Sequence, residues 1–206
     1  MNFDEKAKDW DKDPKKVERA AIFAREIKKE TGNLRIGEAL EFGSGTGLVS
    51  FQLTDTIDKI VLADTSAGML EVLKQKIEKE KISNMTPYLI NDSNPLTLQT
   101  GFDLIYTLLT LHHVKDLKSA FSDFYAVLKP GGTVVIGDLM AEDGSFHYKN
   151  PEFDGHNGFD PEFLKNMLSE KGFEPGSARV FHSIDREYNN VIKNYPLFIL
   201  TGKKIK

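Results

Sequence analysis

Cysteine is absent from this chain of 206 residues, and tryptophan occurs only once. The lack of cysteine excludes a disulfide framework, a thiolate zinc site and a thiol nucleophile. No apolar run approaches the roughly 20 residues that a membrane-spanning helix needs. Residues 1–16 are charged rather than apolar, which is unlike a signal peptide. We therefore expect a cytoplasmic protein that makes no contact with a membrane.

An excess of positive charge is also missing. The chain has 27 Lys and Arg against 31 Asp and Glu, a formal net charge of −4. It lacks the basic footprint of nucleic-acid binding, so we expect no DNA or RNA partner. The length and the 40% apolar content suffice for one domain with a full core. We treat residues 1–206 as that domain, with an N-terminal arm and helix over 1–32.

The chain does contain a glycine-rich turn between two apolar segments. A strand expected over 36–41 ends in Glu41, and Phe-Gly-Ser-Gly-Thr-Gly follows over 42–47. From Leu48 an apolar run resumes that can open a helix. Glycine permits positive φ and lets a ligand approach the main chain closely. Strand, turn and helix start together form the usual ligand cradle of an open α/β sheet.

The spacing of these glycines and the acid before them select the kind of ligand. The turn reads G-x-G-x-G, whereas a dinucleotide fingerprint reads G-x-G-x-x-G and would need a glycine where Leu48 stands. The carboxylate of Glu41 would repel a pyrophosphate at this short range. It suits a ligand with a cationic end. S-adenosylmethionine is such a ligand, since it carries an ammonium and a sulfonium.

The segment 41–47 resembles the first motif of class I S-adenosylmethionine-dependent methyltransferases, E/D-x-G-x-G-x-G. Three further landmarks follow in the order typical of that family: Asp64 after a strand over 59–63, Leu111-His112-His113 after an apolar strand over 102–109, and Leu-Lys-Pro-Gly-Gly-Thr-Val-Val-Ile over 128–136. The segment over 128–136 contains a tight turn before a strand expected over 133–137. The resemblance covers nearly the whole chain.

This resemblance implies an α/β fold: a Rossmann-like, doubly wound sheet of seven strands in the order 3-2-1-4-5-7-6, with strand 7 antiparallel. Local patterns by themselves show only alternating strands and helices. The remaining strands are expected over 86–90, 178–184 and 194–201. Helices are expected from Asp13-Pro14 to near Gly32, after Ser66, after Val114, and from Asp160-Pro161 to Gly172.

The implied cofactor is S-adenosylmethionine, with S-adenosylhomocysteine as the product. Asp64 lies where a ribose-binding carboxylate is expected, at the end of the second strand. The resemblance places Asp92 near the adenine amino group with Ser93 beside it, and Met69 either touches the adenine or packs in the core. The expected cofactor-binding residues are Glu41, Phe42, Gly43, Ser44, Gly45, Asp64, Thr65, Met69, Asp92, Ser93 and Thr107.

The implied reaction is in-line methyl transfer to an O, N, S or C atom of a small-molecule acceptor. His112 and His113 follow a central strand at the carboxyl edge of the sheet, where either can act as a general base or bind the substrate. Because adjacent residues do not easily face one pocket, one of the two is expected to be structural. His156 is expected to point into the pocket from above the helix that starts at Asp160.

An irregular segment over 139–158 is interpreted as a lid over the active-site face. Substrate or lid residues are expected at Asp138, His147 and Trp10, although Trp10 equally suits a plug that ties the arm to the body. We expect no metal site, because His112, His147, His156 and Asp138 lack a ligand spacing such as H-x-x-x-H.

Two other functions stay open at this point. A non-catalytic module that senses S-adenosylmethionine, or scaffolds a partner, would keep the glycine loop and lose the substrate pocket. An NAD(P)-dependent oxidoreductase would use the same sheet, but Leu48 and Glu41 count against it. The oligomeric state, monomer or homodimer, and the identity of the acceptor cannot be derived from these patterns.

Overall fold

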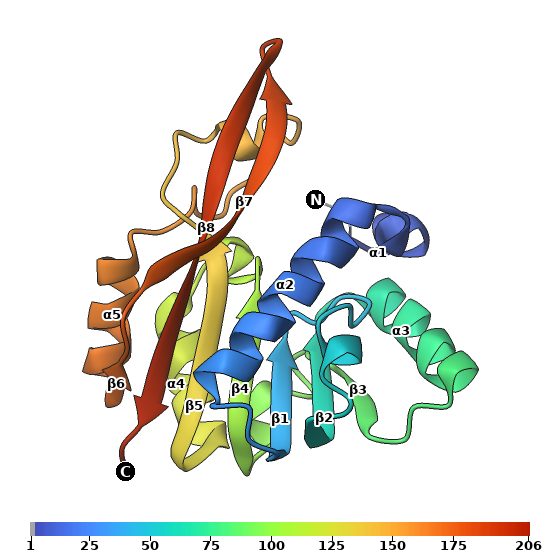
Figure 1. Ribbon diagram of the computed structural model, residues 1–206, viewed down its shortest axis with the longest axis vertical. Helices are drawn as coiled ribbons and strands as arrows, with labels where there is room; N and C mark the ends of the chain where they lie inside the picture. Colours follow the sequence, from blue (N-terminus) through green and yellow to red (C-terminus); the bar gives the residue numbers. More distant parts are fainter. Residues whose placement is uncertain (1–2) are drawn as a thin grey trace.

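The computed structural model describes residues 3–206 and shows one mixed sheet with helices on both faces (Figure 1). The elements, with η for a 3-10 helix, follow in the order α1 (Phe3–Lys6), η1 (Ala7–Lys12), α2 (Pro14–Glu30), β1 (Ile36–Phe42), η2 (Ser50–Gln52), β2 (Ile57–Asp64), α3 (Ala67–Glu80), β3 (Met85–Leu89), η3 (Leu96–Leu98), β4 (Phe102–Leu108), η4 (Leu111–His113), α4 (Leu117–Val127), β5 (Leu128–Leu139), η5 (Ser145–His147), α5 (Pro161–Glu170), β6 (Phe173–Pro175), β7 (Arg179–Tyr188) and β8 (Val191–Lys204). None of the described helices has the length and apolar character needed to cross a membrane.

The strand order confirms the predicted doubly wound topology. The sheet runs β3-β2-β1-β4-β5-β8-β6, and β7 also pairs with β8. Strands β1 to β5 are parallel to one another, whereas β8 lies antiparallel to β5. In the family's order, β8 takes the place of the seventh strand, inserted between the fifth and the sixth.

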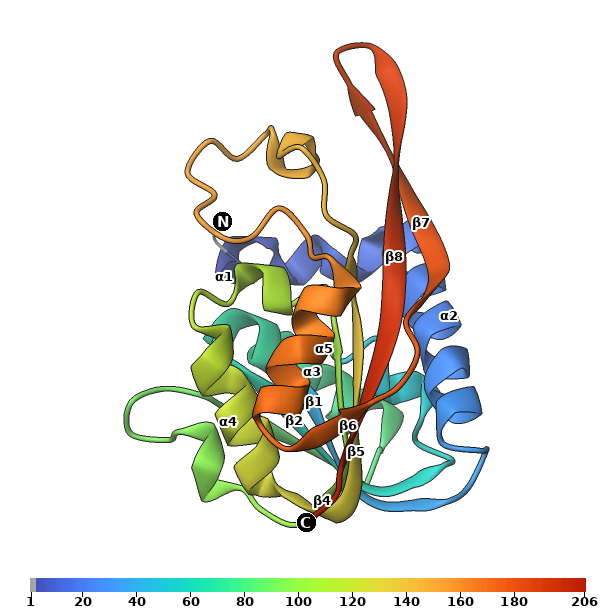
Figure 2. The same ribbon diagram turned by 90° about the vertical axis from the view of Figure 1, so that its left-hand side faces the viewer.

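Alternate residues of the central strands face two different cores. Leu40 and Ile105 pack in the cluster that contains α4 and α5, while Ala39 and Leu104 pack in the cluster that contains α2 and α3. This alternation follows from the two-residue period of a strand. Figure 2 shows α2 on one side of the sheet and α4 and α5 on the other.

Three helices begin where the sequence predicts. The side chain of Asp13 caps α2, Ser66 caps α3 and Asp160 caps α5, each by accepting a hydrogen bond from a main-chain N–H of the first turn. Such caps satisfy donors that have no partner within the helix. Proline at the first position of α2 and α5 has no N–H to satisfy.

The expectation of a helix directly after the glycine loop is wrong. The chain from Leu48 to β2 forms turns and the short η2 instead. Only the eight residues 49–56 separate Leu48 from the start of β2. An α-helix of that length spans about 12 Å, whereas the chain must return along the seven residues of β1, roughly 23 Å. The connection must therefore be more extended than a helix.

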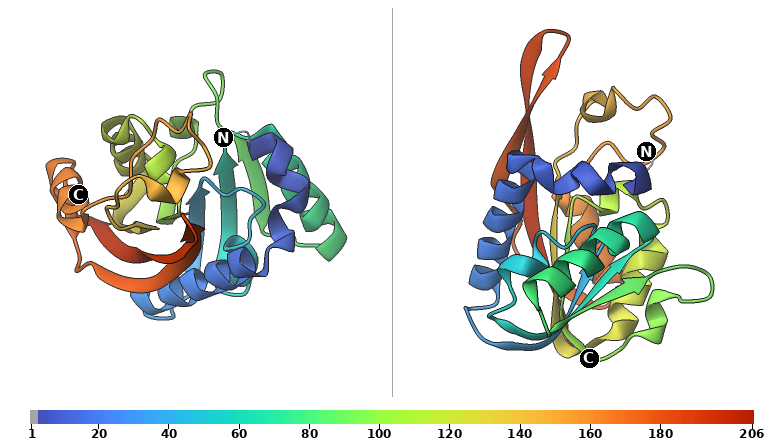
Figure 3. Two further views of the ribbon diagram at one scale, coloured as in Figure 1. Left: turned by 90° about the horizontal axis from the view of Figure 1, so that it is seen from above. Right: turned by 90° about the vertical axis from the view of Figure 1, so that its right-hand side faces the viewer.

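The C-terminal hairpin is longer than predicted. Asn189 and Asn190 both have positive φ (51° and 61°), which is the signature of a two-residue turn of type I′. The polar connection expected around 185–190 is therefore mostly paired strand. The short β6, which the sequence pattern did not predict, pairs with the end of β8, so β6 and β7 share one edge of that strand. Figure 1 shows β7 and β8 projecting beyond the sheet, and Figure 3 shows the projection from two further sides.

Candidate active site

A cavity of about 490 Å³ lies at the carboxyl ends of β1, β2 and β4. This is the edge of a doubly wound sheet at which ligands bind, and the volume is in the range of small-molecule sites. The lining comes from the arm and α2, the glycine loop, the ends of β2 and β4, the lid segment and β7. Among the predicted residues, it includes Trp10, Glu41, Phe42, Gly43, Ser44, Gly45, Asp64, Thr65, Met69, His112, His113 and His147.

The glycine loop folds over the end of β2. The N–H of Gly43 donates to the carbonyl of Ala63 (2.8 Å), and the N–H of Gly45 donates to Oδ2 of Asp64 (2.7 Å). At Gly43 φ is +71°, and a Cβ there would lie 2.2 Å from the side chain of Thr110. Only glycine fits this position, so the main chain itself forms the cavity wall.

Glu41 is buried at the end of β1 and still lines the cavity. The hydroxyl of Ser50 donates to its carboxylate and lies 2.6 Å from the hydroxyl of Tyr106. Burial raises the pKa of Glu41 to about 8, although the hydrogen bonds from Ser50 act in the opposite direction. A cation in the cavity would favour the charged carboxylate.

The other residues of this half of the cavity suit a nucleoside with a cationic end. Burial also raises the pKa of Asp64, against hydrogen bonds from the N–H groups of Ser66 and Gly45. Met69 and Ile90 supply apolar surface for a base. The hydroxyl of Ser44 is buried without a hydrogen-bond partner in the described chain, a polar atom that is available to a ligand. These residues therefore fit S-adenosylmethionine.

His112 is held by a buried acid. Its Nδ1 lies 2.6 Å from Oδ1 of Asp138, and both side chains are almost fully buried. Asp138 also accepts from the main-chain N–H groups of His112 (3.3 Å) and Leu139 (2.8 Å). A carboxylate only accepts hydrogen bonds, so Nδ1 carries the proton of this contact and Nε2 is the ring nitrogen left for another partner. Asp138 therefore acts on the cavity through His112.

His113 and His147 complete a cluster of imidazoles with His112. The ring of His112 lies 4.1 Å from that of His113 and 5.2 Å from that of His147, centroid to centroid. Burial lowers the pKa of His113 to about 3 and that of His147 to about 4, and the neighbouring His112 lowers both further. Both rings are neutral at physiological pH. Both adjacent histidines line the cavity, contrary to the argument that neighbouring residues do not easily face one pocket.

Five predicted site residues lie outside the cavity lining, and one of them, Asp138, contacts the lining residue His112. Asp92 and Ser93 are exposed in a turn held by the side chain of Asn91, and Thr107 is fully buried within β4. His156 differs from its expected position because Nε2 is 3.0 Å from the carbonyl of Val114 and its ring packs on Phe159. The contact with Val114 turns this side chain away from the cavity.

The arm closes one side of the cavity through named contacts. Phe3 and Trp10 both line it, and their rings lie 6.0 Å apart. Asp4 accepts hydrogen bonds from the hydroxyl of Ser66 (2.6 Å) and the N–H of Gly68 (2.7 Å) at the start of α3. Asp11 pairs with Lys76 of α3 at 2.6 Å. Trp10 thus contributes to the cavity and belongs to a segment tied to the body.

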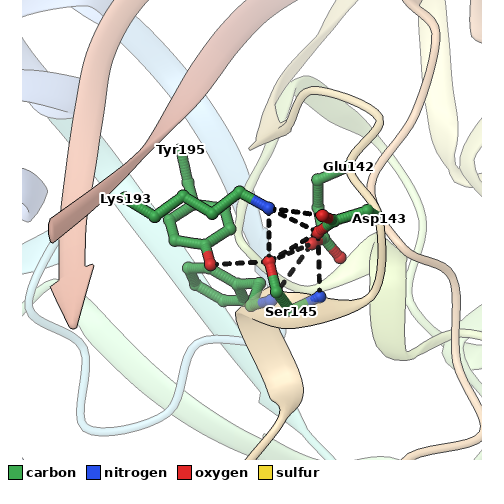
Figure 4. A network of polar contacts seen from close by, with 6 residues as sticks. Glu142, Asp143, Ser145, Lys193 and Tyr195 are labelled. Carbon is green, nitrogen blue, oxygen red and sulfur yellow. Dashed lines mark hydrogen bonds and ion pairs between the residues drawn. The ribbon is translucent and has the colours of Figure 1, made fainter. Parts of the chain in front are cut away.

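The lid segment is tied to the hairpin by a polar network, shown in Figure 4. The hydroxyl of Ser145 lies 2.8 Å from that of the buried Tyr195, and Lys193 pairs with Asp143 at 2.6 Å. The same lysine lowers the pKa of Asp143. These contacts orient η5, from which Phe146 and His147 reach the cavity.

Three cavity cations were not predicted from the sequence. Lys16, Arg19 and Arg186 line the cavity, and none of them forms an ion pair within 4.0 Å in the described part of the chain. Burial lowers the pKa of Arg19 to about 10, and the nearby Arg186 lowers it further. The sequence signal that could have indicated them is the i, i+3 spacing of Lys16 and Arg19, which places both on one face of the first helix.

Comparison with known proteins places this site in a family. A methyltransferase domain family matches residues 40–136. An uncharacterised methyltransferase of Schizosaccharomyces pombe is 29% identical over 145 residues, 63% of this chain and 50% of that protein. The ubiquinone/menaquinone biosynthesis C-methyltransferase UbiE of Pectobacterium carotovorum is 27% identical over 175 residues, 70% of this chain and 69% of the relative.

Solved structures show the same fold. Phosphoethanolamine N-methyltransferase 2 of Haemonchus contortus, in complex with phosphomonomethylethanolamine and S-adenosylhomocysteine, aligns with a TM-score of 0.70 at 18% identity over 89% of this chain and 52% of that chain. In sequence and fold, the chain is similar to class I S-adenosylmethionine-dependent methyltransferases. These similarities support the predicted family and cofactor. The chain spans only half the length of its S. pombe relative.

Proposed function

We propose that this methyltransferase methylates a small molecule that carries a carboxylate or a phosphate. The observation that supports this acceptor is the set of three cavity cations, Lys16, Arg19 and Arg186, that lack ion pairs with described residues. Lys16 lies over the Trp10 ring and Arg186 donates to the Phe146 carbonyl, but neither contact supplies a counter-charge. Cations without a counter-charge in a partly enclosed site are costly unless a ligand supplies one. The cofactor brings one carboxylate, so the remaining positive charge favours an anionic acceptor.

The two halves of the cavity divide the work. Glu41 and Asp64 would hold the ammonium end and the ribose of the cofactor, and the glycine loop would approach it with main-chain N–H groups. Bound S-adenosylmethionine supplies an electrophilic methyl group. Arg19 and Arg186 would fix the anion of the acceptor, which orients its nucleophilic atom. Such orientation can contribute about 7–11 kcal/mol to lowering the barrier.

His112 is the residue best placed to handle a proton. Because Asp138 holds the proton on Nδ1, the Nε2 lone pair is free to accept one from an O, N or S nucleophile, or from an activated carbon. A positioned base of this kind is worth about 10²–10⁴-fold in rate. The neutral His113 is an additional hydrogen-bonding group beside it.

The proposal is tested with S-adenosylmethionine that carries a labelled methyl group. The enzyme is incubated with separate pools of metabolites, RNA and protein, and the labelled metabolites are fractionated by anion exchange. We expect label in the anionic metabolite fraction. Label in RNA or protein, or in a neutral metabolite, would refute the proposed acceptor. Cofactor binding with no label in any pool would favour a sensing module.

Paired variants then test the cations. Replacing Arg19 and Arg186 together with glutamine should lower kcat/KM for the acceptor by about 10²-fold, because a hydrogen bond to a charged group contributes roughly 1.5–3 kcal/mol. Arg25→Gln, on the exposed side of the same helix, is the matched control and should leave kcat/KM unchanged. Equal kinetics for the double variant and the control would argue against an anionic acceptor.

A further inference from the structure

Three histidines from two distant segments converge in the acceptor half of the cavity. His112 and His113 lie on η4 after β4, and His147 ends η5 in the lid segment. One ring nitrogen of each lies within 4.8 Å of those of the other two. We propose that His112, His113 and His147 bind a divalent transition-metal ion of the Zn²⁺ or Co²⁺ class.

The lone pair of His112 is oriented as metal binding requires. A ligating histidine usually donates its other ring N–H to a carboxylate, which fixes the tautomer and increases the basicity of the ligating nitrogen. Nδ1 of His112 makes this contact with Asp138 at 2.6 Å, and both residues are nearly inaccessible to solvent. Asp138 is itself fixed by two main-chain N–H groups. The pair is therefore preorganised to present Nε2.

His147 has a nitrogen without a partner. Its Nδ1 is buried and forms no hydrogen bond within the described residues. Because only 7% of the residue is exposed, water does not readily supply a partner either. Leaving a buried polar atom unpaired costs roughly 1–3 kcal/mol. The ring is nevertheless held in place, stacked on Phe153 at 3.7 Å and 10°. A bound ion would use a nitrogen in this position.

Aromatic rings surround the cluster and limit access of water. Phe3 lies edge-on to His113 at 5.3 Å, and Phe146 lies edge-on to His147 at 4.9 Å. An apolar surround strengthens the interaction of an ion with its ligands because the local dielectric is low. The exposed edge of the site faces the cavity that contains the proposed acceptor position.

The geometry fits a three-histidine site after a small closure. Four ligands at about 2.1 Å around a tetrahedral ion lie roughly 3.4 Å apart. The cluster spans 4.8 Å, so the rings must approach by a little more than 1 Å. Both His113 and His147 end 3-10 turns, where a change of χ angles moves the ring without disturbing the sheet. Three protein ligands leave the fourth position open, as in catalytic zinc sites.

The charges of the surrounding groups also fit. Asp138, in contact with His112, brings one carboxylate to the cluster, while Arg186 lines the same cavity and opposes the ion. An ion of charge +2 beside a single carboxylate leaves a net positive site. An anionic acceptor would complete its coordination.

The ion would change the role of the cluster in catalysis. With Nε2 of His112 bound to the ion, the lone pair no longer accepts a proton. An acceptor oxygen or nitrogen at the open position would instead lose its proton more readily, because the ion lowers its pKa. This catalytic role rests on the proposed function, whereas the binding of the ion does not.

The experiment uses the untagged full chain, treated with a chelator and then titrated with Zn²⁺ and with Co²⁺ in the absence of cofactor and acceptor. We expect one ion per chain by calorimetry and the visible absorption of low-coordinate, histidine-bound Co²⁺. His147→Ala should weaken binding at least about tenfold, and Asp138→Asn by about 10–100-fold. His182→Ala, a histidine on β7 outside the cluster, is the matched control and should bind as the wild type does.

Two results would overturn the proposal: less than stoichiometric binding by the wild type, or equal affinity in His147→Ala and His182→Ala. Thermal unfolding checks that each variant folds, and His147→Gln replaces His147→Ala if that variant does not. Failure of metal binding with methyl transfer intact would leave His112 as the base. Metal binding without transfer to any anionic metabolite would refute the proposed function alone.

Discussion

The two halves of the cavity are built in different ways. The cofactor half comes from neighbouring strand ends, namely the glycine loop after β1 and Asp64 after β2. The acceptor half is assembled from α2, η4, the lid segment and β7, which are far apart in the sequence. The first half is fixed by the sheet, whereas the second depends on tertiary contacts of the arm, the lid and the hairpin.

The halves also differ in charge. The cofactor half contains the carboxyl groups of Glu41 and Asp64, both with raised pKa, and the acceptor half contains Arg19 and Arg186. A ligand pair with a cationic end and an anionic acceptor matches this division. Variants in one half should therefore leave binding in the other half unchanged, and the predictions below test that separation.

The largest effect is expected for Glu41→Gln on stability. The folded-state pKa of Glu41 is about 8 against an ordinary value of 4.5, so its ionisation costs no stability below pH 4.5 and destabilises the free protein increasingly up to pH 8. The amide has no such cost. At about 1.4 kcal/mol per pH unit, the variant should gain up to about 4 kcal/mol on the wild type between pH 5 and pH 8, measured by urea unfolding.

Glu38→Gln, in the exposed part of β1, is the control for this variant and should show no growing difference. A constant difference between Glu41→Gln and wild type across pH 5–8 would contradict the raised pKa. Cofactor binding supplies a second readout, since a cationic ligand lowers the pKa of Glu41. The wild type should release a proton on binding near pH 7, seen by calorimetry in buffers of different ionisation enthalpy, and Glu41→Gln should not.

Asp64→Ala tests the cofactor half directly. Loss of a carboxylate that holds two ribose hydroxyls should weaken cofactor binding by about 10²-fold, since each such bond contributes roughly 1.5–3 kcal/mol. Calorimetry measures the affinity, and the KM of the acceptor at saturating cofactor should stay unchanged. Asp103→Ala, at the opposite end of the sheet, is the control. Wild-type affinity in Asp64→Ala would remove this residue from the site.

The difference between the halves explains how far the sequence could be interpreted. The glycine loop, Asp64 and His112 are recognisable because each follows a strand of a parallel sheet, and such strand ends meet at one edge. These patterns carry the resemblance that implied the family, the topology and the cofactor. No helix follows Leu48 in the described chain because the connection to β2 is too short for one, and local apolar periodicity does not measure the length of a connection.

The acceptor half was harder to predict from the sequence, for a physical reason. His147 and Arg186 reach the cavity only because the lid is bonded to β8 and β7 extends beyond the sheet. No local pattern encodes either contact. His156 has the same residue type in the same loop, yet its ring bonds to Val114. Residue type alone therefore could not separate a cavity histidine from a packing one, nor show that three histidines meet.

A smaller effect is expected when the lid is loosened. Tyr195→Phe removes the hydroxyl that lies 2.8 Å from that of Ser145, which should cost about 1–2 kcal/mol at a buried site. Because η5 carries His147, we expect the KM of the acceptor to rise several-fold while the cofactor affinity stays constant. Tyr188→Phe, near the hairpin turn, is the control. A change in cofactor affinity instead would place the lid in the other half of the cavity.

The smallest effect concerns the arm, whose described residues contact both halves. Asp11 pairs with Lys76 at 2.6 Å and also accepts a hydrogen bond from Thr46 of the glycine loop. Asp11→Asn should cost about 0.5–1 kcal/mol, which increases hydrogen exchange in η1 by roughly two- to fivefold. Since Phe3 of this arm packs on His113, cofactor affinity and acceptor KM should worsen by the same small factor. Asp9→Asn is the control, because the exposed ion pair of Asp9 with Lys12 lies within η1. It should change neither the cofactor affinity nor the acceptor KM. A shift in only one of the two constants would assign the arm to that half and show that the cavity is closed from one side.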